Sequence, residues 1–181
     1  HRGLTEKTDQ ILISDLISSK KNLAENLMIV DVLRNDISRV SISGTVDVKK
    51  LASLETYENV HHLVSYISSK IQPNKNAVDL LKACLPGASV TGAPKIRAME
   101  IIEELENLNR SFYAGCMGYF DANGDMDTCI SLRSGLVKDK KLYVQAGGGV
   151  VYDSNPDDEY QETLNKARAL MAAAKDSYKY N

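Results

Sequence analysis

The sequence predicts an α+β protein, in which helices and antiparallel hairpins occupy separate stretches of the chain. Residues 20–37 and 94–105 carry apolar side chains at helical spacing. Residues 112–151 instead contain β-rich runs joined by short polar turns. A length of 181 residues allows one domain, or a piece of a larger one. We therefore expect residues 1–181 to form one domain, or part of one, that contains both helices and antiparallel hairpins.

Composition and charge exclude several classes of protein. The chain is 43% hydrophobic and 25% charged, which is typical of a soluble globular protein, and its net charge of −2 gives no reason to expect a nucleic-acid partner. Cys84, Cys116 and Cys129 form neither a disulfide framework nor a zinc pattern, so we expect a reducing cytoplasmic location. The sequence has no apolar run of transmembrane length and no signal peptide before its first polar segment, so we expect no membrane partner.

Three helices are expected in the first half of the chain. A short helix is predicted at residues 11–17, a longer one at 20–37, and a third at 77–85 that Pro86 and Gly87 end. Glu25 interrupts an apolar part of the second helix. Such a glutamate is either half-exposed or a metal-binding carboxylate.

Between these helices the period of the apolar residues changes to that of strands. Valine and isoleucine alternate on both sides of Gly44, which predicts a hairpin there. A further strand is predicted at 57–71, where alternation places His61 and His62 on opposite faces. One histidine is expected to be an ordinary surface or core residue, whereas the inward one could act near neutral pH.

A long amphipathic helix is predicted from Pro94 to Leu105, with Thr91 as its cap. Its expected buried stripe consists of Ile96, Met99, Ile101 or Ile102, and Leu105. The preceding loop, 92–95, is either a simple cap or a site where backbone N–H groups hold an anion.

The strand-rich part contains one charged residue of interest. Small residues at 113–120 would let a ligand approach the sheet, and 121–125 is expected to form a turn. Residues 126–137 and 141–151 are predicted to pair as a hairpin. Arg133 lies in the first of these strands, so it is either paired in the core or placed to bind a ligand carboxylate with its guanidinium.

The stretch 145–166 combines glycines with a charged helix. Three glycines follow a strand, a turn is expected at Asp153-Ser154-Asn155-Pro156, and a helix is predicted over 157–180. Glu159, Glu162 and Lys166 fall on one face of that helix. Two carboxylates on one face suit Mg²⁺, although they are equally typical of a solvated first turn with an i, i+4 salt bridge.

Five segments together resemble the chorismate-binding enzymes. They are ENLMIVDVLRND, VHHLVS, SVTGAPKIRAMEIIEELE, GDMDTCISLR and QAGGGVVYDSNPDDEYQETLNKA, which occur in this order over nearly the whole chain. The family includes the large subunit of anthranilate synthase, aminodeoxychorismate synthase component I, and the isochorismate and salicylate synthases. The resemblance implies an α/β sandwich with a large antiparallel sheet flanked by helices.

The resemblance also implies a set of site residues. It makes Glu25, Glu159 and Glu162 ligands of Mg²⁺, and it makes His62 and Lys166 catalytic. The implied substrate-binding residues are Thr91, Tyr113, Arg133, Gly147, Gly148 and Gly149. Asn22 departs from the pattern, because many members carry an acid at that position.

The segments ENLMIVD, VHHLVS and SVTGAPKI most resemble aminodeoxychorismate synthase component I. That resemblance implies Mg²⁺-dependent amination of chorismate to 4-amino-4-deoxychorismate for folate synthesis, with ammonia from a glutamine amidotransferase subunit. DMDTCISLR and KARAL are closer to anthranilate synthase component I, which makes anthranilate for tryptophan, so this activity is the alternative. A non-catalytic chorismate-binding relative, or an amidotransferase scaffold, is an alternative of another class.

The family's Pro-Ile-x-Gly-Thr segment distinguishes the two branches, and it would lie before residue 1. We therefore expect 1–181 to be an incomplete domain that is inactive alone.

Overall fold

The computed structural model describes residues 2–152 and 154–176 and confirms the α+β class. Its helices are α1 Glu6–Ser18, α2 Lys20–Ser38, α3 Ala77–Cys84, α4 Ala88–Thr91, α5 Lys95–Leu105 and α6 Pro156–Asp176. Its strands are β1 Asp47–Thr56, β2 His61–Ser68, β3 Cys116–Phe120, β4 Met126–Ile130, β5 Gly135–Lys138 and β6 Lys141–Val144. The chain divides into two compact units, one reaching Cys84 and including Ala93–Ala98, the other comprising Leu85–Gly92 and the chain from Met99 onward.

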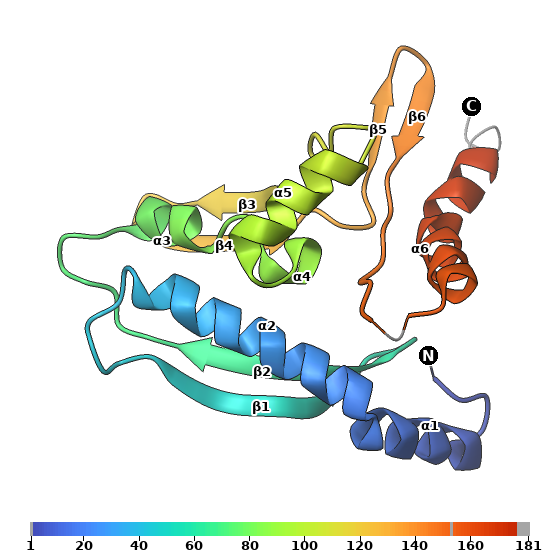
Figure 1. The fold of residues 1–181 in the computed structure, drawn as a ribbon, viewed down its shortest axis with the longest axis horizontal. Coiled ribbons are helices and arrows are strands. Elements are labelled where there is room, and N and C mark those ends of the chain that lie inside the picture. Colours follow the sequence, from blue (N-terminus) through green and yellow to red (C-terminus); the bar gives the residue numbers. More distant parts are fainter. Residues whose placement is uncertain (1, 153, 177–181) are drawn as a thin grey trace. The chain divides into compact units, whose positions relative to one another are not determined.

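Helix α2 lies along the antiparallel β1–β2 sheet in the first unit (Figure 1). Asn26 on α2 joins the two layers, because its side-chain amide donates to the carbonyl of Leu63 at 3.2 Å and accepts from the Ser65 hydroxyl at 2.5 Å. Val30, only 4% exposed, forms part of the small core between helix and sheet. Helix α2 is thus held against the sheet by both polar and apolar contacts.

Helix α1 begins five residues before the predicted 11–17 segment. The side chains of Thr5 and Thr8 form a capping box that satisfies backbone N–H groups at the start of the helix. Ser19 caps α2 by accepting from the N–H of Asn22 at 3.3 Å. These hydroxyl caps define the two helix starts more sharply than apolar spacing does.

The hairpin predicted around Gly44 is wrong. Gly44 does occupy a turn, with φ +78°, but the strand that follows starts at Asp47 and pairs with β2 across residues 57–60. The segment before Gly44 is joined to the far end of the sheet by an isolated bridge between Ser41 and Ile71 and by a hydrogen bond between the hydroxyls of Ser41 and Ser69. Of the alternating apolar residues, only Val48 lies in a strand, and alternation could not specify the partner strand.

The second unit contains two hairpins, and the predicted pairing of 126–137 with 141–151 is right only for residues 135–138 and 141–144, because residues 126–130 pair with 116–120 instead. Asp121 closes the β3–β4 turn by accepting from the N–H groups of Asn123 and Asp125 at 2.9 Å, and Asp139 and Lys140 form the β5–β6 turn. The predicted strand 126–137 is interrupted, because Arg133 adopts φ +52° between β4 and β5. Strands of the described residues pair as three two-stranded antiparallel sheets.

The apolar stripe predicted for α5 is not buried. Ile96 is 66% exposed and Leu105 73% exposed, and none of the residues of α5 is classed as buried. Thr91 does not cap this helix, since it ends α4 and its hydroxyl donates to the carbonyl of Gly87 at 3.1 Å. An amphipathic stripe indicates which face could pack, but burial requires a second layer against it.

Helix α6 begins at Pro156, close to the predicted start. The side chain of Asn155 accepts from the backbone N–H groups of Asp157 and Asp158 at 2.9 and 3.3 Å. The predicted end at Tyr180 and the turn residue Asp153 lie outside the described residues.

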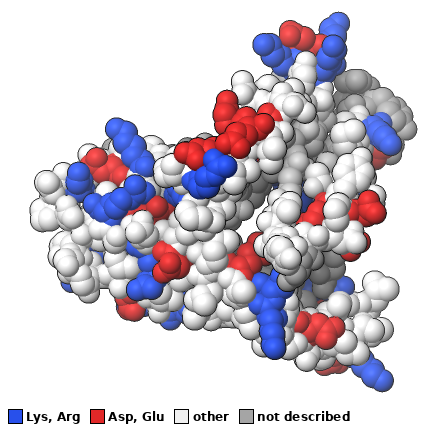
Figure 2. Space-filling model, viewed as in Figure 1, with Lys and Arg blue, Asp and Glu red and all other residues white. Residues whose placement is uncertain are grey.

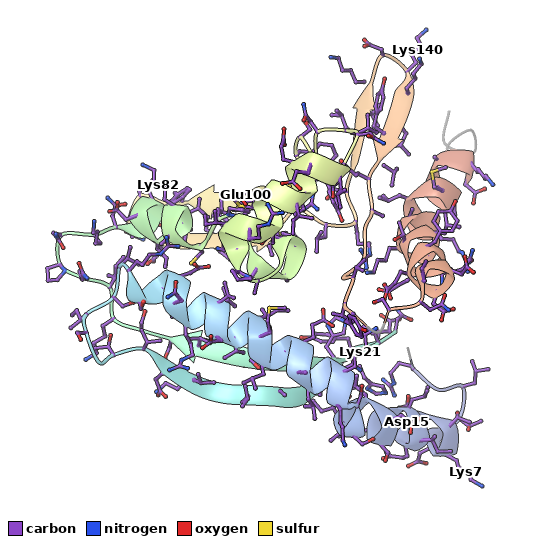
Figure 3. All side chains as sticks on the ribbon, in the orientation of Figure 1. Lys7, Asp15, Lys21, Lys82, Glu100 and Lys140 are labelled. Carbon is purple, nitrogen blue, oxygen red and sulfur yellow. The ribbon has the colours of Figure 1, made fainter. Side chains whose placement is uncertain are left out.

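Charged side chains are spread over the surface. Figure 3 shows Lys7 and Asp15 projecting from α1 and Lys140 projecting from the tip of the β5–β6 hairpin. On the face drawn in Figure 2, basic and acidic side chains are interspersed. Over residues 2–152 and 154–176, the helices are all too short or too polar to cross a membrane.

Candidate active site

The glycine segment after β6 lies against α6 and Tyr113 in the second unit. Lys166 donates from Nζ to the carbonyl of Gly147 at 3.1 Å. A Cβ added to Gly147 would lie 3.2 Å from the Tyr113 hydroxyl, and one added to Gly148 would lie 3.2 Å from Oε2 of Glu159. Side chains at these positions would crowd polar groups, so bare backbone leaves room for a ligand beside them.

The two glutamates of α6 lie one turn apart, as predicted. Glu162 pairs with Lys166, with 2.5 Å between Oε1 and Nζ, and Glu159 accepts from the Ser154 hydroxyl at 2.7 Å. The i, i+4 salt bridge of the simpler interpretation is therefore present. It does not remove the metal hypothesis, because a carboxylate has two oxygens and can bind two cations.

The donor chemistry of this pair fits Mg²⁺. The ion prefers oxygen ligands and usually takes one or two protein carboxylates, with water and substrate oxygens completing its shell. Glu25 is exposed on α2 and belongs to the first unit. No group of three or more potential metal ligands is assembled within the described part of the chain.

Arg133 and Thr91 are placed differently from their sequence expectations. Arg133 is exposed in the loop after β4, not paired in the core, and its guanidinium has no hydrogen-bond or ion-pair partner among the described residues. Thr91 is half-buried at the end of α4. The arginine therefore keeps its donors available for an anion.

The two histidines face opposite sides of β2, as alternation predicted, but the buried one is His61. Its Nε2 lies 2.9 Å from Oδ1 of Asp9, and its Nδ1 lies 2.9 Å from the Thr56 hydroxyl. His62 is exposed, with its ring edge-to-face against Tyr57 at 5.6 Å between centroids. The inward histidine thus has both ring nitrogens engaged within the protein.

Asp9 was not singled out by the sequence, yet it is the centre of a buried cluster. The Nε of Arg2 donates to both of its oxygens at 3.0 Å, and the N–H of Gly3 donates at 2.7 Å. The Arg2 hydrogen bonds, followed by those from Gly3 and His61, hold the pKa of the Asp9 carboxyl well below its usual range. No sequence pattern predicts the contact between Asp9 and His61, which are 52 positions apart.

A second buried acid, Asp36, binds Lys95, the lysine of the 92–95 loop. Asp36 is 3% exposed and binds Nζ of Lys95 at 2.5 Å and Nη2 of Arg39 at 2.9 Å. Lys95 also donates to the carbonyl of Cys84 at 3.2 Å. Its ammonium is therefore engaged by protein oxygens, which favours a structural role for this loop over the predicted anion site.

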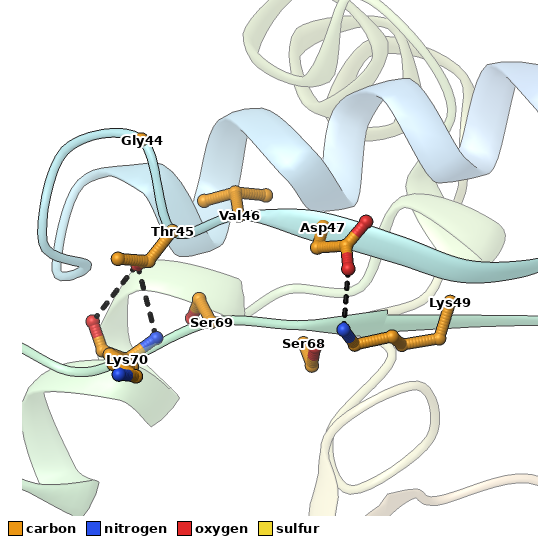
Figure 4. Close-up of a pocket in the computed structure, with 8 residues that line it drawn as sticks. All are labelled: Gly44, Thr45, Val46, Asp47, Lys49, Ser68, Ser69 and Lys70. Carbon is orange, nitrogen blue, oxygen red and sulfur yellow. Dashed lines mark hydrogen bonds and ion pairs between the residues drawn. The ribbon is translucent and has the colours of Figure 1, made fainter.

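The end of the β1–β2 sheet carries a pocket that is open to solvent (Figure 4). Its rim includes the exposed ion pair of Asp47 and Lys49 at 2.5 Å, and Thr45, which accepts from the N–H of Lys70 at 3.1 Å. The lining residues include none of the predicted site residues. This pocket therefore does not change the site assignment.

Comparison with known proteins decides the family. The profile of the family described as chorismate binding enzyme matches residues 1–172. The chain belongs to the chorismate binding enzyme family. It is 53% identical over 176 residues to anthranilate synthase component 1 of Cereibacter sphaeroides, covering 97% of this chain and 35% of that protein. It is 48% identical over 172 residues to the protein of the same name from Pseudomonas putida, covering 95% and 35%.

Solved structures of chorismate binding enzymes share the fold. Anthranilate synthase component I from Streptococcus pneumoniae matches with a TM-score of 0.85 and 48% identity, over 90% of this chain and 37% of that one. The menaquinone-specific isochorismate synthase from Escherichia coli matches with a TM-score of 0.78 and 29% identity, over 94% and 39%. The chain spans about a third of the length of the curated relatives that it matches.

The lead prediction, aminodeoxychorismate synthase component I, is wrong. The relatives at 45–53% identity carry the name anthranilate synthase component 1, which was the alternative. Side chains that serve a common fold and site cannot by themselves separate two branches that share chorismate.

Proposed function

We propose that the whole protein carrying this chain is an anthranilate synthase component I, which converts chorismate and ammonia into anthranilate. The observation that carries the proposal is the run of relatives with this name, at 45–53% identity over 93–97% of the chain. The arrangement of Lys166, Glu159 and Tyr113 around bare glycine backbone supports it.

The substrate side of the proposal uses groups in the second unit. Chorismate is a dianion, so its two carboxylates need cationic or N–H donors. Arg133, whose guanidinium has no partner in the described structure, is suited to bind a carboxylate through two parallel N–H bonds. Tyr113, Thr91 and the backbone of Gly147, Gly148 and Gly149 would complete the binding surface.

Glu159 and Glu162 would hold Mg²⁺ in the second unit, and Glu25 belongs to the metal set by the family resemblance alone. When bound, the ion would polarise the ring carboxylate and help to orient the ring. Lys166 forms an ion pair with Glu162 and donates a hydrogen bond to the carbonyl of Gly147. It therefore connects the acidic face of α6 to the glycine segment. The match of carboxylate chemistry to a hard cation supports this assignment.

The reaction itself requires ammonia to add to the ring, the ring hydroxyl to leave as water, and the enolpyruvyl group to leave as pyruvate, with loss of a ring proton and protonation of the enolpyruvyl methylene carbon. A proton must reach the departing hydroxyl oxygen. We assign this proton transfer to His62, which is exposed on β2 and which the family resemblance makes catalytic. Ammonia would come from a glutamine amidotransferase partner, and we place the protein in the cytoplasm, which its three free cysteines support.

The test is product analysis with the whole protein, chorismate, Mg²⁺ and ammonium salt at alkaline pH. We expect fluorescent anthranilate and equimolar pyruvate, both lost when the metal is chelated. Formation of 4-amino-4-deoxychorismate or isochorismate would contradict the proposed branch. Chorismate binding without turnover would instead support the non-catalytic alternative.

A further inference from the structure

Arg110, in the loop between α5 and β3, bonds to three different parts of the second unit. Its Nη1 donates to the carbonyl of Val90 at 2.6 Å. Its Nε and Nη2 donate to the two oxygens of Glu106 at 2.9 and 2.6 Å. The guanidinium carbon lies 5.9 Å from the centre of the Tyr113 ring, within reach of a cation–π contact.

Two contacts of this arginine, with Val90 and Tyr113, lie at or next to residues of the proposed substrate site. Val90 immediately precedes Thr91 in α4. Tyr113 donates its backbone N–H to the carbonyl of Arg110 at 2.8 Å, and its hydroxyl approaches Gly147. One planar cation therefore connects α4, the Tyr113 turn and, through Tyr113, the glycine segment.

We propose that Arg110 is a positioning residue for chorismate binding. Arg110 fixes Tyr113 and the Thr91 end of α4 relative to each other. The inference rests on the proposed function and deepens it, because it assigns a residue that would not touch substrate. Only arginine suits the position, since its flat group donates in several directions and stacks on a ring at once. Glu106 accepts hydrogen bonds from two nitrogens of the guanidinium and thereby raises the pKa of Arg110.

Two kinds of variant separate positioning from stability. Arg110→Ala removes all three contacts, and Arg110→Lys keeps a charge but cannot reproduce the fork or the stacking. Glu106→Gln weakens the ion pair while leaving the contacts to Val90 and Tyr113 available. Arg168→Lys, an exposed position on α6, is the matched control for the arginine-to-lysine change.

The experiment measures KM and kcat for chorismate, the calorimetric Kd for chorismate, and the thermal midpoint of the whole protein. We expect Arg110→Ala to raise KM and Kd by about tenfold or more, as loss of a charge-assisted hydrogen bond implies, with kcat at saturation nearly unchanged. Arg110→Lys should recover only part of this loss. Glu106→Gln should lower the thermal midpoint with little effect on KM.

Wild-type KM and Kd in both Arg110 variants would overturn the inference. So would a KM that rises in Glu106→Gln as much as in Arg110→Ala, because binding would then follow general stability. Failure of the wild-type protein to make anthranilate would refute the proposed function instead, and the Kd values would still test the positioning role wherever chorismate binds.

Discussion

At the scale of single residues, the first unit contains two buried carboxylates, Asp9 and Asp36, each bound by several donors. Burying a charge is costly unless it is paired and hydrogen-bonded. Asp9 has Arg2, the N–H of Gly3 and His61, whereas Asp36 has Lys95 and Arg39. Both clusters join segments that are distant in sequence, so their loss would loosen tertiary structure and not one helix alone.

Asp9→Asn is expected to lower the thermal midpoint at neutral pH. The folded-state pKa of Asp9 is depressed, so its stabilising effect is fully present above the unfolded value of about 3.9 and is lost as pH falls below that value. The difference between wild type and variant should therefore shrink from pH 5 to pH 2. The measurement is the thermal midpoint of both proteins across this pH range. Asp15→Asn, at an exposed position, is the control. A difference that does not depend on pH would contradict it.

Glu162→Gln is expected to weaken Mg²⁺-dependent turnover while leaving the fold intact. The side chain of Glu162 is 53% exposed, so its removal should hardly change the thermal midpoint. The apparent Mg²⁺ affinity should fall by at least about tenfold, the range seen when groups around a metal are lost. Titration of activity with Mg²⁺ measures this, and Asp158→Asn on the same helix is the control. Unchanged activity at limiting Mg²⁺ would remove Glu162 from the metal set.

Arg133→Ala is expected to raise KM for chorismate by about ten- to a hundredfold. This factor corresponds to the free energy that a hydrogen bond to a charged group contributes. Arg133→Lys should restore little, because an ammonium cannot form two parallel bonds to a carboxylate. Alanine and lysine bear the same backbone cost at φ +52°, so comparing these variants isolates the side chain. Steady-state kinetics decide, and a wild-type KM in the lysine variant would count against the role.

At the scale of elements, the β3–β4 hairpin depends on a glycine in its middle. A Cβ on Gly118 would lie 2.1 Å from the carbonyl oxygen of Asp127 and 2.7 Å from Cα of Thr128. These are backbone atoms of the facing strand, so a rotamer change cannot relieve the overlap. The hairpin that leads into the Arg133 loop thus requires close contact between two main chains.

Gly118→Ala should therefore destabilise the protein by about 1–3 kcal/mol, as overpacking does. Denaturant unfolding of the whole protein measures it. Met117→Ala on the same strand is the control, because that side chain is 49% exposed and its loss should cost less. An equal free energy of unfolding for Gly118→Ala and wild type would contradict this prediction, because the two strands would then have moved apart without loss of stability.

At the scale of the whole molecule, much apolar surface is uncovered within residues 2–152 and 154–176. Val150 is 79% exposed, Leu108 77% and Val137 74%. The described strands pair only in twos, and isolated two-stranded hairpins are marginal in water. Exposed edges and apolar patches of this kind favour association.

We therefore expect this chain, expressed alone from residue 1, to self-associate and to bind chorismate weakly or not at all. Size-exclusion chromatography and calorimetric titration of chorismate in Mg²⁺ test both parts, with the whole protein as the comparison. A stable monomer with micromolar affinity for chorismate would show that these residues suffice for the site.

Several local features could be predicted from the sequence alone. Helical spacing located α2, α3 and α6, and turn residues located the β3–β4 and β5–β6 hairpins, because caps, periodicity and turns are properties of neighbouring residues. The shared face of Glu159, Glu162 and Lys166 followed from helix geometry. The motifs together identified the chorismate binding enzyme family.

Only the tertiary structure decided which distant groups meet. It buried His61 against Asp9, directed Lys95 to Asp36, brought Tyr113 to Gly147, and revealed Arg110 as a link. It also showed that the first hairpin is formed by β1 and β2, and that the apolar stripe of α5 is exposed. Alternation and amphipathicity state which face a residue occupies, but they carry no information about the partner. Pairing depends on the free energy of the whole packed arrangement.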